Sequence, residues 1–215
     1  MKLRESGMPE ETYWESLLDV ELILDRLGID ATLRDVAELG CGYGTFTLPV
    51  ARRIRGAVQT YDIEPAMVER TLRRAEQAGL ANVRAAVRDV LSEGFGGDPG
   101  TKDACLLFNI LHGEHPERLL AGAASVVRPE GFVLVVHWRC DRETPRGPSL
   151  EIRPRPEQII EWARRSGGLS PDGAVIELPP WHYGIRFRRS RIASANASGS
   201  RATHSGAAEP QPKQT

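Results

Sequence analysis

The stretch that decides the fold is VAELGCGYGTFT, residues 36–47. Gly40, Gly42 and Gly44 recur at alternate positions, two residues behind the acidic Glu38. Glycines at this spacing permit positive φ angles and let backbone N–H groups approach a ligand without a Cβ in the way. An apolar segment precedes the loop and a helical pattern follows it, so the stretch predicts a strand, a glycine-rich turn and a helix. In a doubly wound sheet that corner binds the ligand.

The same alternation of strand and helix continues on the carboxyl side of the loop. Helices are expected over 12–27 and 46–55, and others begin at Pro65, Pro116 and Pro156. Strands are expected at 33–39, 57–62, 82–87, 103–111, 132–138, 175–178 and 182–189. Because only Pro179-Pro180-Trp181 separates the last two strands, they must be antiparallel. The sequence therefore predicts an α/β fold: a doubly wound, mostly parallel seven-stranded sheet with helices on both faces and one antiparallel strand near the C-terminus.

Three segments of different character follow from this pattern. Residues 1–30 carry a helix expected to cover the ligand site, and residues 31–189 form the ligand-binding domain. Residues 190–215 contain no aromatic side chain and a single large aliphatic one, Ile192. Such a segment buries too little surface to offset its ordering entropy, so this tail is expected to be disordered.

Composition excludes several classes of function. The 28 Lys and Arg residues nearly balance the 29 Asp and Glu residues, so there is no overall positive field that would gather nucleic acid, and no nucleic-acid partner is expected. The sequence shows no apolar run of membrane-spanning length and no signal segment, so no membrane association and a cytoplasmic location are expected. Three cysteines without CxxC spacing predict neither a disulfide framework nor a metal site. The oligomeric state stays open.

Two cofactors suit a glycine loop at this position: a dinucleotide and S-adenosylmethionine. A dinucleotide fingerprint needs G-x-G-x-x-G, but here the third glycine comes one residue early and Thr45 takes its place. Glu38 would repel a pyrophosphate, whereas it would attract a ligand that carries a sulfonium and an ammonium. The sign of the charge therefore favours S-adenosylmethionine.

With these residues in place, the sequence resembles the class I S-adenosylmethionine-dependent methyltransferases over roughly residues 33–189. The first motif of that family is an acidic residue, a spacer and alternating glycines, as in ELGCGYG at 38–44. The resemblance implies a Rossmann-like methyltransferase fold, S-adenosylmethionine as the cofactor and methyl transfer as the activity. It also implies further cofactor-binding residues after successive strands. Those are Asp62 on the ribose hydroxyls with Ile63 beside it, Asp89 and Val90 at the adenine edge, and Asn109 at the methionine end.

Candidates for the methyl acceptor's pocket lie after the later strands and on the leading helix. They are Tyr13, Trp14, His112, His137, Arg139, Trp181 and Tyr183. None is assigned as catalytic, because methyl transfer from a sulfonium mainly requires positioning and exclusion of water. A general base is needed only where the acceptor has a proton to lose. Five arginines between 139 and 155 are interpreted either as a clamp for an anionic acceptor or as a solvated loop.

The function predicted from these residues is methyl transfer to a small-molecule acceptor. Two alternatives stay open from the residues alone. One is a non-catalytic module that binds S-adenosylmethionine for regulation, and the other is an NAD-dependent oxidoreductase, which the missing third glycine and Glu38 disfavour. Nucleic-acid methylation ranks lower, because Asn109 is followed by Ile110 and Leu111 and not by the Pro-Pro-aromatic motif of amino-methylating enzymes.

Overall fold

The computed structural model describes residues 8–191 of the 215. The strands are β1 (Val36–Leu39), β2 (Val58–Asp62), β3 (Val83–Val87), β4 (Lys102–Phe108), β5 (Val127–Trp138), β6 (Leu169–Pro171), β7 (Ile176–Leu178) and β8 (His182–Arg189). The helices are α1 (Glu11–Ser16), α2 (Val20–Leu27), α3 (Thr47–Arg53), α4 (Pro65–Gln77), α5 (Val90–Glu93), α6 (Pro116–Val126), the 3-10 helix η1 (Leu150–Ile152) and α7 (Pro156–Ser166). The expectation for a tail at 190–215 lies outside the described residues except at its first two positions.

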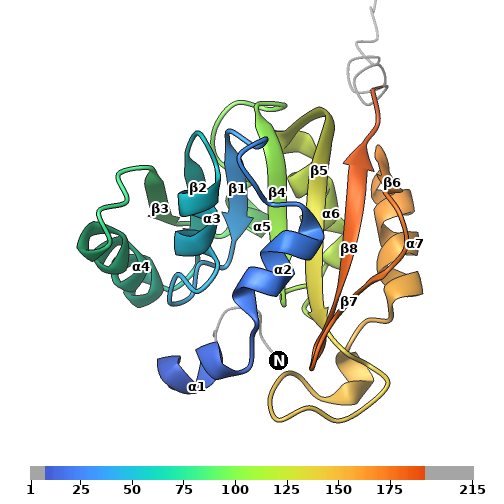
Figure 1. The fold of residues 1–215 in the computed structure, drawn as a ribbon. Coiled ribbons are helices and arrows are strands. Elements are labelled where there is room, and N and C mark those ends of the chain that lie inside the picture. Colours follow the sequence, from blue (N-terminus) through green and yellow to red (C-terminus); the bar gives the residue numbers. More distant parts are fainter. Residues whose placement is uncertain (1–7, 192–215) are drawn as a thin grey trace, which may run out of the picture.

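Eight strands within the described range form one sheet in the order β3-β2-β1-β4-β5-β8-β6, with β7 also paired to β8 (Figure 1). The pairs β3-β2, β2-β1, β1-β4 and β4-β5 are parallel, and β8 is antiparallel to β5, β6 and β7. The predicted doubly wound sheet with an antiparallel strand near the C-terminus is therefore confirmed. The parallel strands end at one common edge, and α1 and the connection between β5 and α7 lie beyond that edge (Figure 1).

Two hydrophobic layers cover the two faces of the sheet. Because side chains alternate along a strand, Leu106 and Phe108 of β4 pack towards α2, α3 and α4, whereas Cys105 and Leu107 pack towards α6 and α7. The same alternation continues in β5, where Leu134 and Val133 face opposite layers. This explains why both strands read as unbroken apolar runs.

The structure differs from the sequence prediction at the leading helix, which is broken into α1 and α2. Asp19 ends the continuity because its carboxylate accepts a hydrogen bond from the N–H of Leu22 at 3.1 Å and so caps a new helix. The apolar spacing of this segment is also satisfied by two short helices that meet at an angle. The prediction of one helix over 12–27 is therefore wrong.

Two further boundaries differ, and one strand is additional. β4 ends at Phe108, because Asn109 adopts a left-handed conformation with φ of 58° and turns the chain off the strand. β5 begins at Val127, five residues before the expected strand, and its register with β4 is irregular between Lys102 and Ala104. An unexpected short strand, β6, pairs with β8, so the sheet has one more strand than predicted.

No helix among the described residues combines the length and the apolar composition needed to cross a bilayer. The described side chains also contain no group of three or more His, Cys, Asp or Glu arranged to hold a metal ion.

Candidate functional site

A cavity of about 790 Å³ opens at the carboxyl ends of β1, β2, β3 and β4. It is lined by the glycine loop, by the turn after β2, by the start of α5 and by the segment from Phe108 to Leu119. Seven of the nine predicted cofactor-binding residues line it: Gly40, Gly42, Asp62, Ile63, Asp89, Val90 and Asn109. Glu38 and Gly44 do not.

The glycine loop turns the chain from β1 into α3 through three left-handed residues, with φ of 84° at Gly40, 50° at Gly42 and 80° at Gly44. A Cβ on Gly44 would lie 2.5 Å from Leu48 Cδ1 and 3.2 Å from Thr71 Oγ1. Gly44 therefore permits close packing of the loop on α3 and α4. Gly40 and Gly42 line the cavity, but their N–H groups are already engaged, that of Gly40 by the carbonyl of Tyr61 at 2.7 Å and that of Gly42 by Asp62.

Asp62 ties the glycine loop to the end of β2. Its Oδ2 accepts a hydrogen bond from the N–H of Gly42 at 3.0 Å, and its Oδ1 accepts one from the N–H of Glu64 at 3.0 Å. The Sγ of Cys41 is a second, weaker donor to Oδ2 at 3.7 Å, so the lone pair that remains for a hydroxyl from the cavity is on Oδ1. This is the arrangement that ribose recognition requires.

Glu38 lies beneath the loop and is not among the residues that line the cavity, so its attraction to a cationic ligand stays a prediction. It shares a strand face with Val36, which packs towards α3, and its Oε2 accepts a hydrogen bond from Thr47 Oγ1 of that helix at 2.5 Å. Burial raises the pKa of Glu38 to about 7, against the opposing hydrogen bond from Thr47. Glu38 is therefore a structural support for the start of α3, and Asp62 is the carboxylate that the cavity presents.

The start of α5 forms the part of the cavity predicted to hold adenine. Asp89 is the N-cap of α5, and its carboxylate accepts a hydrogen bond from the N–H of Leu91 at 3.0 Å. Val90 is the first residue of the helix, where a backbone N–H has no partner within the helix. Both groups lie where the resemblance expects them, at the end of the third strand.

Two buried oxygen atoms in the lining have no hydrogen-bond partner among the described residues: Thr45 Oγ1 and Asn109 Oδ1. Buried polar atoms without a partner are rare, and at a site they mark the place of a missing donor. Asn109 belongs to the end of the cavity expected for the methionine portion, whose ammonium is such a donor, and Thr45 directly follows the glycine loop. The sequence prediction did not include Thr45 among the cofactor-binding residues, although its position directly after the loop is a signal that it lines the site.

These features fit S-adenosylmethionine. The loop lets its backbone approach a ligand without a Cβ in the way, Asp62 offers an acceptor for hydroxyls, and Thr45 and Asn109 offer acceptors for an ammonium. None of these groups carries the positive charge that would neutralise a pyrophosphate, although Arg88 and Arg118 also line the cavity.

The residues predicted for the acceptor pocket fare less well. Trp14 and His112 line the cavity. Tyr13, His137, Arg139, Trp181 and Tyr183 do not. Whether these five residues contact the acceptor therefore stays a prediction.

The reasons lie in packing. Tyr183 is buried and donates a hydrogen bond to the carbonyl of Pro154 at 2.6 Å, so it anchors the start of α7. Arg139 is held by Asp141 through two hydrogen bonds of 2.9 and 2.7 Å. Arg153 is also used internally, since its guanidinium donates to carbonyls of the connection between β5 and α7 and lies over the Trp138 ring. The arginines of this connection therefore support its shape, and the clamp interpretation gains no support.

His137 is fully buried one layer behind the cavity wall. Its Nε2 lies 3.3 Å from Nδ1 of His112, and its own Nδ1 lies 3.3 Å from the carbonyl of Trp138. Burial lowers the pKa of His137 to about 3. Burial also lowers the pKa of His112, and the positive charge of the nearby Arg153 lowers it further.

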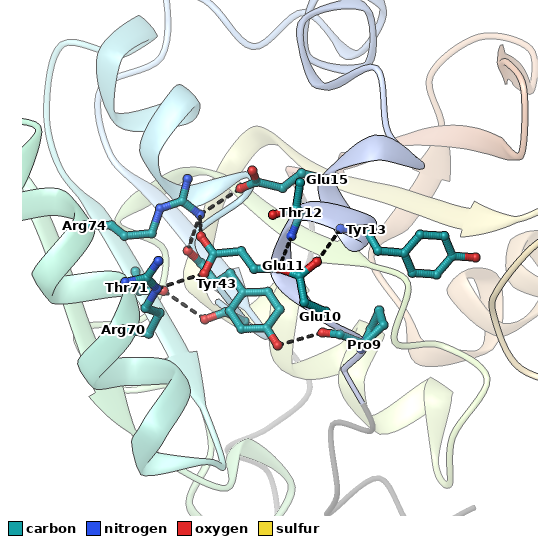
Figure 2. A network of polar contacts seen from close by, with 11 residues as sticks. Pro9, Glu10, Glu11, Thr12, Tyr13, Glu15, Tyr43, Arg70, Thr71 and Arg74 are labelled. Carbon is teal, nitrogen blue, oxygen red and sulfur yellow. Dashed lines mark hydrogen bonds and ion pairs between the residues drawn. The ribbon is translucent and has the colours of Figure 1, made fainter.

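Helix α1 is attached to the rim of the cavity by ion pairs with α4 (Figure 2). Glu11 lies 2.9 Å from Arg70 Nε and 3.0 Å from Arg74 Nη1, and Glu15 lies 2.8 Å from Arg74 Nη1. The four side chains are partly exposed, so each pair contributes less than about 1 kcal/mol. Together they fix α1 in one orientation.

A second attachment joins α1 to the glycine loop itself. The hydroxyl of Tyr43 donates to the carbonyl of Pro9 at 2.7 Å (Figure 2). Met8 and Trp14, on either side of this bond, both reach the cavity wall. Tyr13 points away from the network and donates to the carbonyl of Pro145, which explains why it misses the cavity.

Known proteins share these features. Residues 36–131 match the family model described as a methyltransferase domain. Over slightly less than half of its length the chain is thus similar to the S-adenosylmethionine-dependent methyltransferases. Its cofactor is therefore S-adenosylmethionine, and the resemblance seen in the sequence is confirmed.

Two curated relatives and one solved structure are similar to this chain. The catalytic subunit TRM61 of a tRNA (adenine(58)-N(1))-methyltransferase from Cryptococcus neoformans is 33% identical over 102 residues, which cover 46% of this chain. Aklanonic acid methyltransferase DauC from Streptomyces sp. (strain C5) is 36% identical over 62 residues, or 28% of this chain. The matches span only 23% and 28% of those relatives. A methyltransferase from Aquifex aeolicus shares the fold with a TM-score of 0.73 at 20% identity, covering 84% of this chain and 94% of that one.

Proposed function

We propose that this methyltransferase transfers a methyl group to a small-molecule acceptor that binds in the same cavity as the cofactor. The observation that carries the proposal is that the cavity does not end at the cofactor-binding groups. Its lining also includes Trp14 of α1 and His112. Its volume of about 790 Å³ lies within the range of roughly 300–1,000 Å³ typical of small-ligand sites.

Bound S-adenosylmethionine supplies a methyl group on a sulfonium, which a nucleophile can displace in line. The chain's own residues bind and orient. The glycine loop presents its backbone, Asp62 accepts from the ribose hydroxyls, and Asp89 and Val90 hold the adenine edge. Thr45 and Asn109 accept from the ammonium. Holding two reactants in line is worth several kcal/mol of barrier, so these positioning groups are enough for catalysis of an easily ionised acceptor.

Residues 8–30 act as a cover in this proposal. Met8 and Trp14 close one side of the cavity, and Trp14 packs edge-on against Trp138 with ring centroids 6.1 Å apart. A cover that excludes water strengthens electrostatic contacts inside the site. It also limits the size of the acceptor, which favours a small molecule over a polymer.

The relative that acts on tRNA makes RNA the alternative acceptor that an experiment must separate. The overall charge of −1 provides no general attraction for phosphates. The described cavity residues carry both signs, with Arg88 and Arg118 beside Asp62, Asp89 and Glu114. A small acceptor is therefore the better supported choice.

The first experiment tests the cofactor site by isothermal titration with S-adenosylmethionine, S-adenosylhomocysteine and NAD. Asp62→Asn should weaken binding of the first two by about tenfold or more, because a hydroxyl-accepting oxygen is lost. Asp103→Asn is the matched control. Asp103 also accepts two backbone N–H bonds, from Arg34 at 2.7 Å and Asp35 at 2.9 Å, but it lies at the opposite end of the strands. Equal losses in both variants would contradict the ribose assignment.

The second experiment tests the acceptor. Release of S-adenosylhomocysteine is followed with a panel of phenols, alcohols, amines, carboxylic acids and thiols, and in parallel with unmodified tRNA. Turnover with a small molecule and none with tRNA is the expected result. Methylation of tRNA alone would overturn the small-molecule proposal, and cofactor binding without any turnover would favour the non-catalytic module.

A further inference from the structure

The buried pair His112 and His137 connects the cavity to a backbone carbonyl by a chain of two close contacts. The carbonyl oxygen of Trp138 lies 3.3 Å from His137 Nδ1, and His137 Nε2 lies 3.3 Å from His112 Nδ1. The rings of the two histidines meet edge to face, with centroids 5.4 Å apart. Neither His137 nor Trp138 lines the cavity, whereas His112 does.

The direction of each hydrogen bond follows from the carbonyl. A carbonyl oxygen only accepts, so the proton of His137 must sit on Nδ1. Neutral His137 then has a lone pair on Nε2 and must accept from its neighbour. His112 Nδ1 therefore carries a proton and donates it to His137.

The remaining nitrogen of His112 follows directly. In a neutral imidazole with a proton on Nδ1, Nε2 is an acceptor. Among residues 8–191 no hydrogen bond engages this atom, and His112 lines the cavity. His112 thus presents an unprotonated nitrogen where an acceptor would bind.

We propose that His112 is the general base of the methyl transfer and that His137 is the positioning residue that holds it in the base-competent tautomer. This inference rests on the proposed function and extends it. It assigns the acceptor to compounds whose reacting atom carries a proton, namely hydroxyl or amine compounds.

The step balances as follows for a hydroxyl acceptor. A lone pair of the acceptor oxygen forms the bond to the methyl carbon, and the carbon–sulfur bond breaks with its electron pair remaining on sulfur. The hydroxyl proton passes to Nε2 of His112, which becomes an imidazolium. The proton then leaves to water when the products depart. An amine acceptor loses its N–H proton to the same atom.

The surroundings keep His112 neutral before the reaction. His137 faces it from β5, Arg153 lies near it from the connection before α7, and Glu114, His115 and Arg118 belong to its own side of the cavity. Burial and Arg153 lower the pKa of His112 below its ordinary value of 6.5, so it is unprotonated at pH 7. The acid limb of the rate profile should therefore lie below pH 6.5.

The first test is independent of activity. Long-range proton–nitrogen correlation spectra of ¹⁵N-histidine-labelled protein at pH 7 distinguish the two tautomers of each ring, and single variants assign the signals. We expect His112 and His137 both to be protonated on Nδ1. In His137→Phe the acceptor is lost, so His112 should revert to a mixture of tautomers, whereas the amide oxygen introduced by His137→Gln should preserve the Nδ1–H form. A His112 that is protonated on Nε2, or cationic, at pH 7 overturns the proposal.

The second test uses whichever acceptor of the panel releases S-adenosylhomocysteine. Removing a general base typically costs 10²- to 10⁴-fold, so His112→Gln should lower kcat by about that factor and abolish its acid limb, while the Kd for S-adenosylhomocysteine stays unchanged. His137→Phe should lower kcat less, and His137→Gln should restore most of it. Undiminished kcat in His112→Gln overturns the base assignment while leaving the proposed function intact. Turnover with thioethers or tertiary amines alone also overturns it, because such acceptors have no proton to lose.

Discussion

The dependence of stability on pH tests the placement of the buried titratable groups most directly. Burial lowers the pKa values of His137 and His182 to about 3 in the folded protein, against 6.5 for an ordinary histidine. Below pH 6.5 these two histidines therefore bind a proton each in the unfolded chain but not in the folded chain, and stability falls as the pH falls. Burial raises the pKa of Glu38 from 4.5 to about 7, so the folded chain holds one proton that the unfolded chain releases above pH 4.5. Its contribution to stability falls as the pH rises.

The two effects oppose each other between pH 5 and 6. The two histidines outweigh Glu38, so the unfolded chain binds about one proton more than the folded chain. One proton of difference corresponds to about 1.4 kcal/mol per pH unit. The free energy of unfolding should therefore rise by about 1.4 kcal/mol from pH 5 to pH 6, and His112 adds to it in the same direction. Asp103 and Asp172, whose pKa values are lowered, titrate in the unfolded chain near 3.8, below this window.

Urea unfolding at several pH values between 5 and 6 measures this slope, with a constant m-value as the check on two-state behaviour. Two variants should move it in opposite directions. His182→Gln removes one histidine and should reduce the slope by about 1.4 kcal/mol per pH unit, whereas Glu38→Gln should increase it by the same amount. Because the slope is independent of each variant's absolute stability, packing losses do not confound it. Profiles parallel to the wild type in both variants would refute the reasoning.

Three other predictions concern the loop, the cover and the thiols. Gly44→Ala should lower the free energy of unfolding in urea by about 1–3 kcal/mol more than Gly79→Ala does. Both glycines have positive φ, but only a Cβ on Gly44 would meet another atom at 2.5 Å. Equal losses in the two variants would exclude this packing role. Arg74→Met should speed stopped-flow release of S-adenosylhomocysteine about fivefold and reduce its salt dependence, since two ion pairs worth about 1 kcal/mol together are lost while the Glu11–Arg70 pair remains. An unchanged rate argues against a cover. Of the three cysteines only Cys140 should react rapidly with a thiol reagent at pH 8, because burial raises the pKa of the other two thiols; a second fast-reacting thiol in the native protein contradicts the buried assignment.

Much of the fold follows from local sequence. Buried strands are continuous apolar runs, and prolines at the first turn mark the starts of α4, α6 and α7. The short Pro-Pro-Trp connection forces β7 and β8 to be antiparallel. The break at Asp19 was missed, because a single side chain that caps a helix competes there with an apolar spacing that continues across it.

The cofactor half of the site could also be predicted from the sequence. Gly40, Gly42 and Asn109 follow strands and Asp62 ends one, and the carboxyl ends of parallel strands meet at one edge of the sheet. A position in the chain is then enough to place a residue in the cavity.

The acceptor half of the site could not be predicted from the sequence. There, whether a residue lines the cavity depends on which face of a strand or loop its side chain takes. His112 and His137 read alike in the sequence, yet one lines the cavity and the other is buried behind it. Glu38 has the charge that the cofactor needs, but alternation along β1 directs it under α3. The order of residues determined the sheet, its ligand-binding edge and the cofactor. Only the packing of helices from distant parts of the chain decided which polar groups face that ligand, since burial on either side of a strand is settled by what covers it.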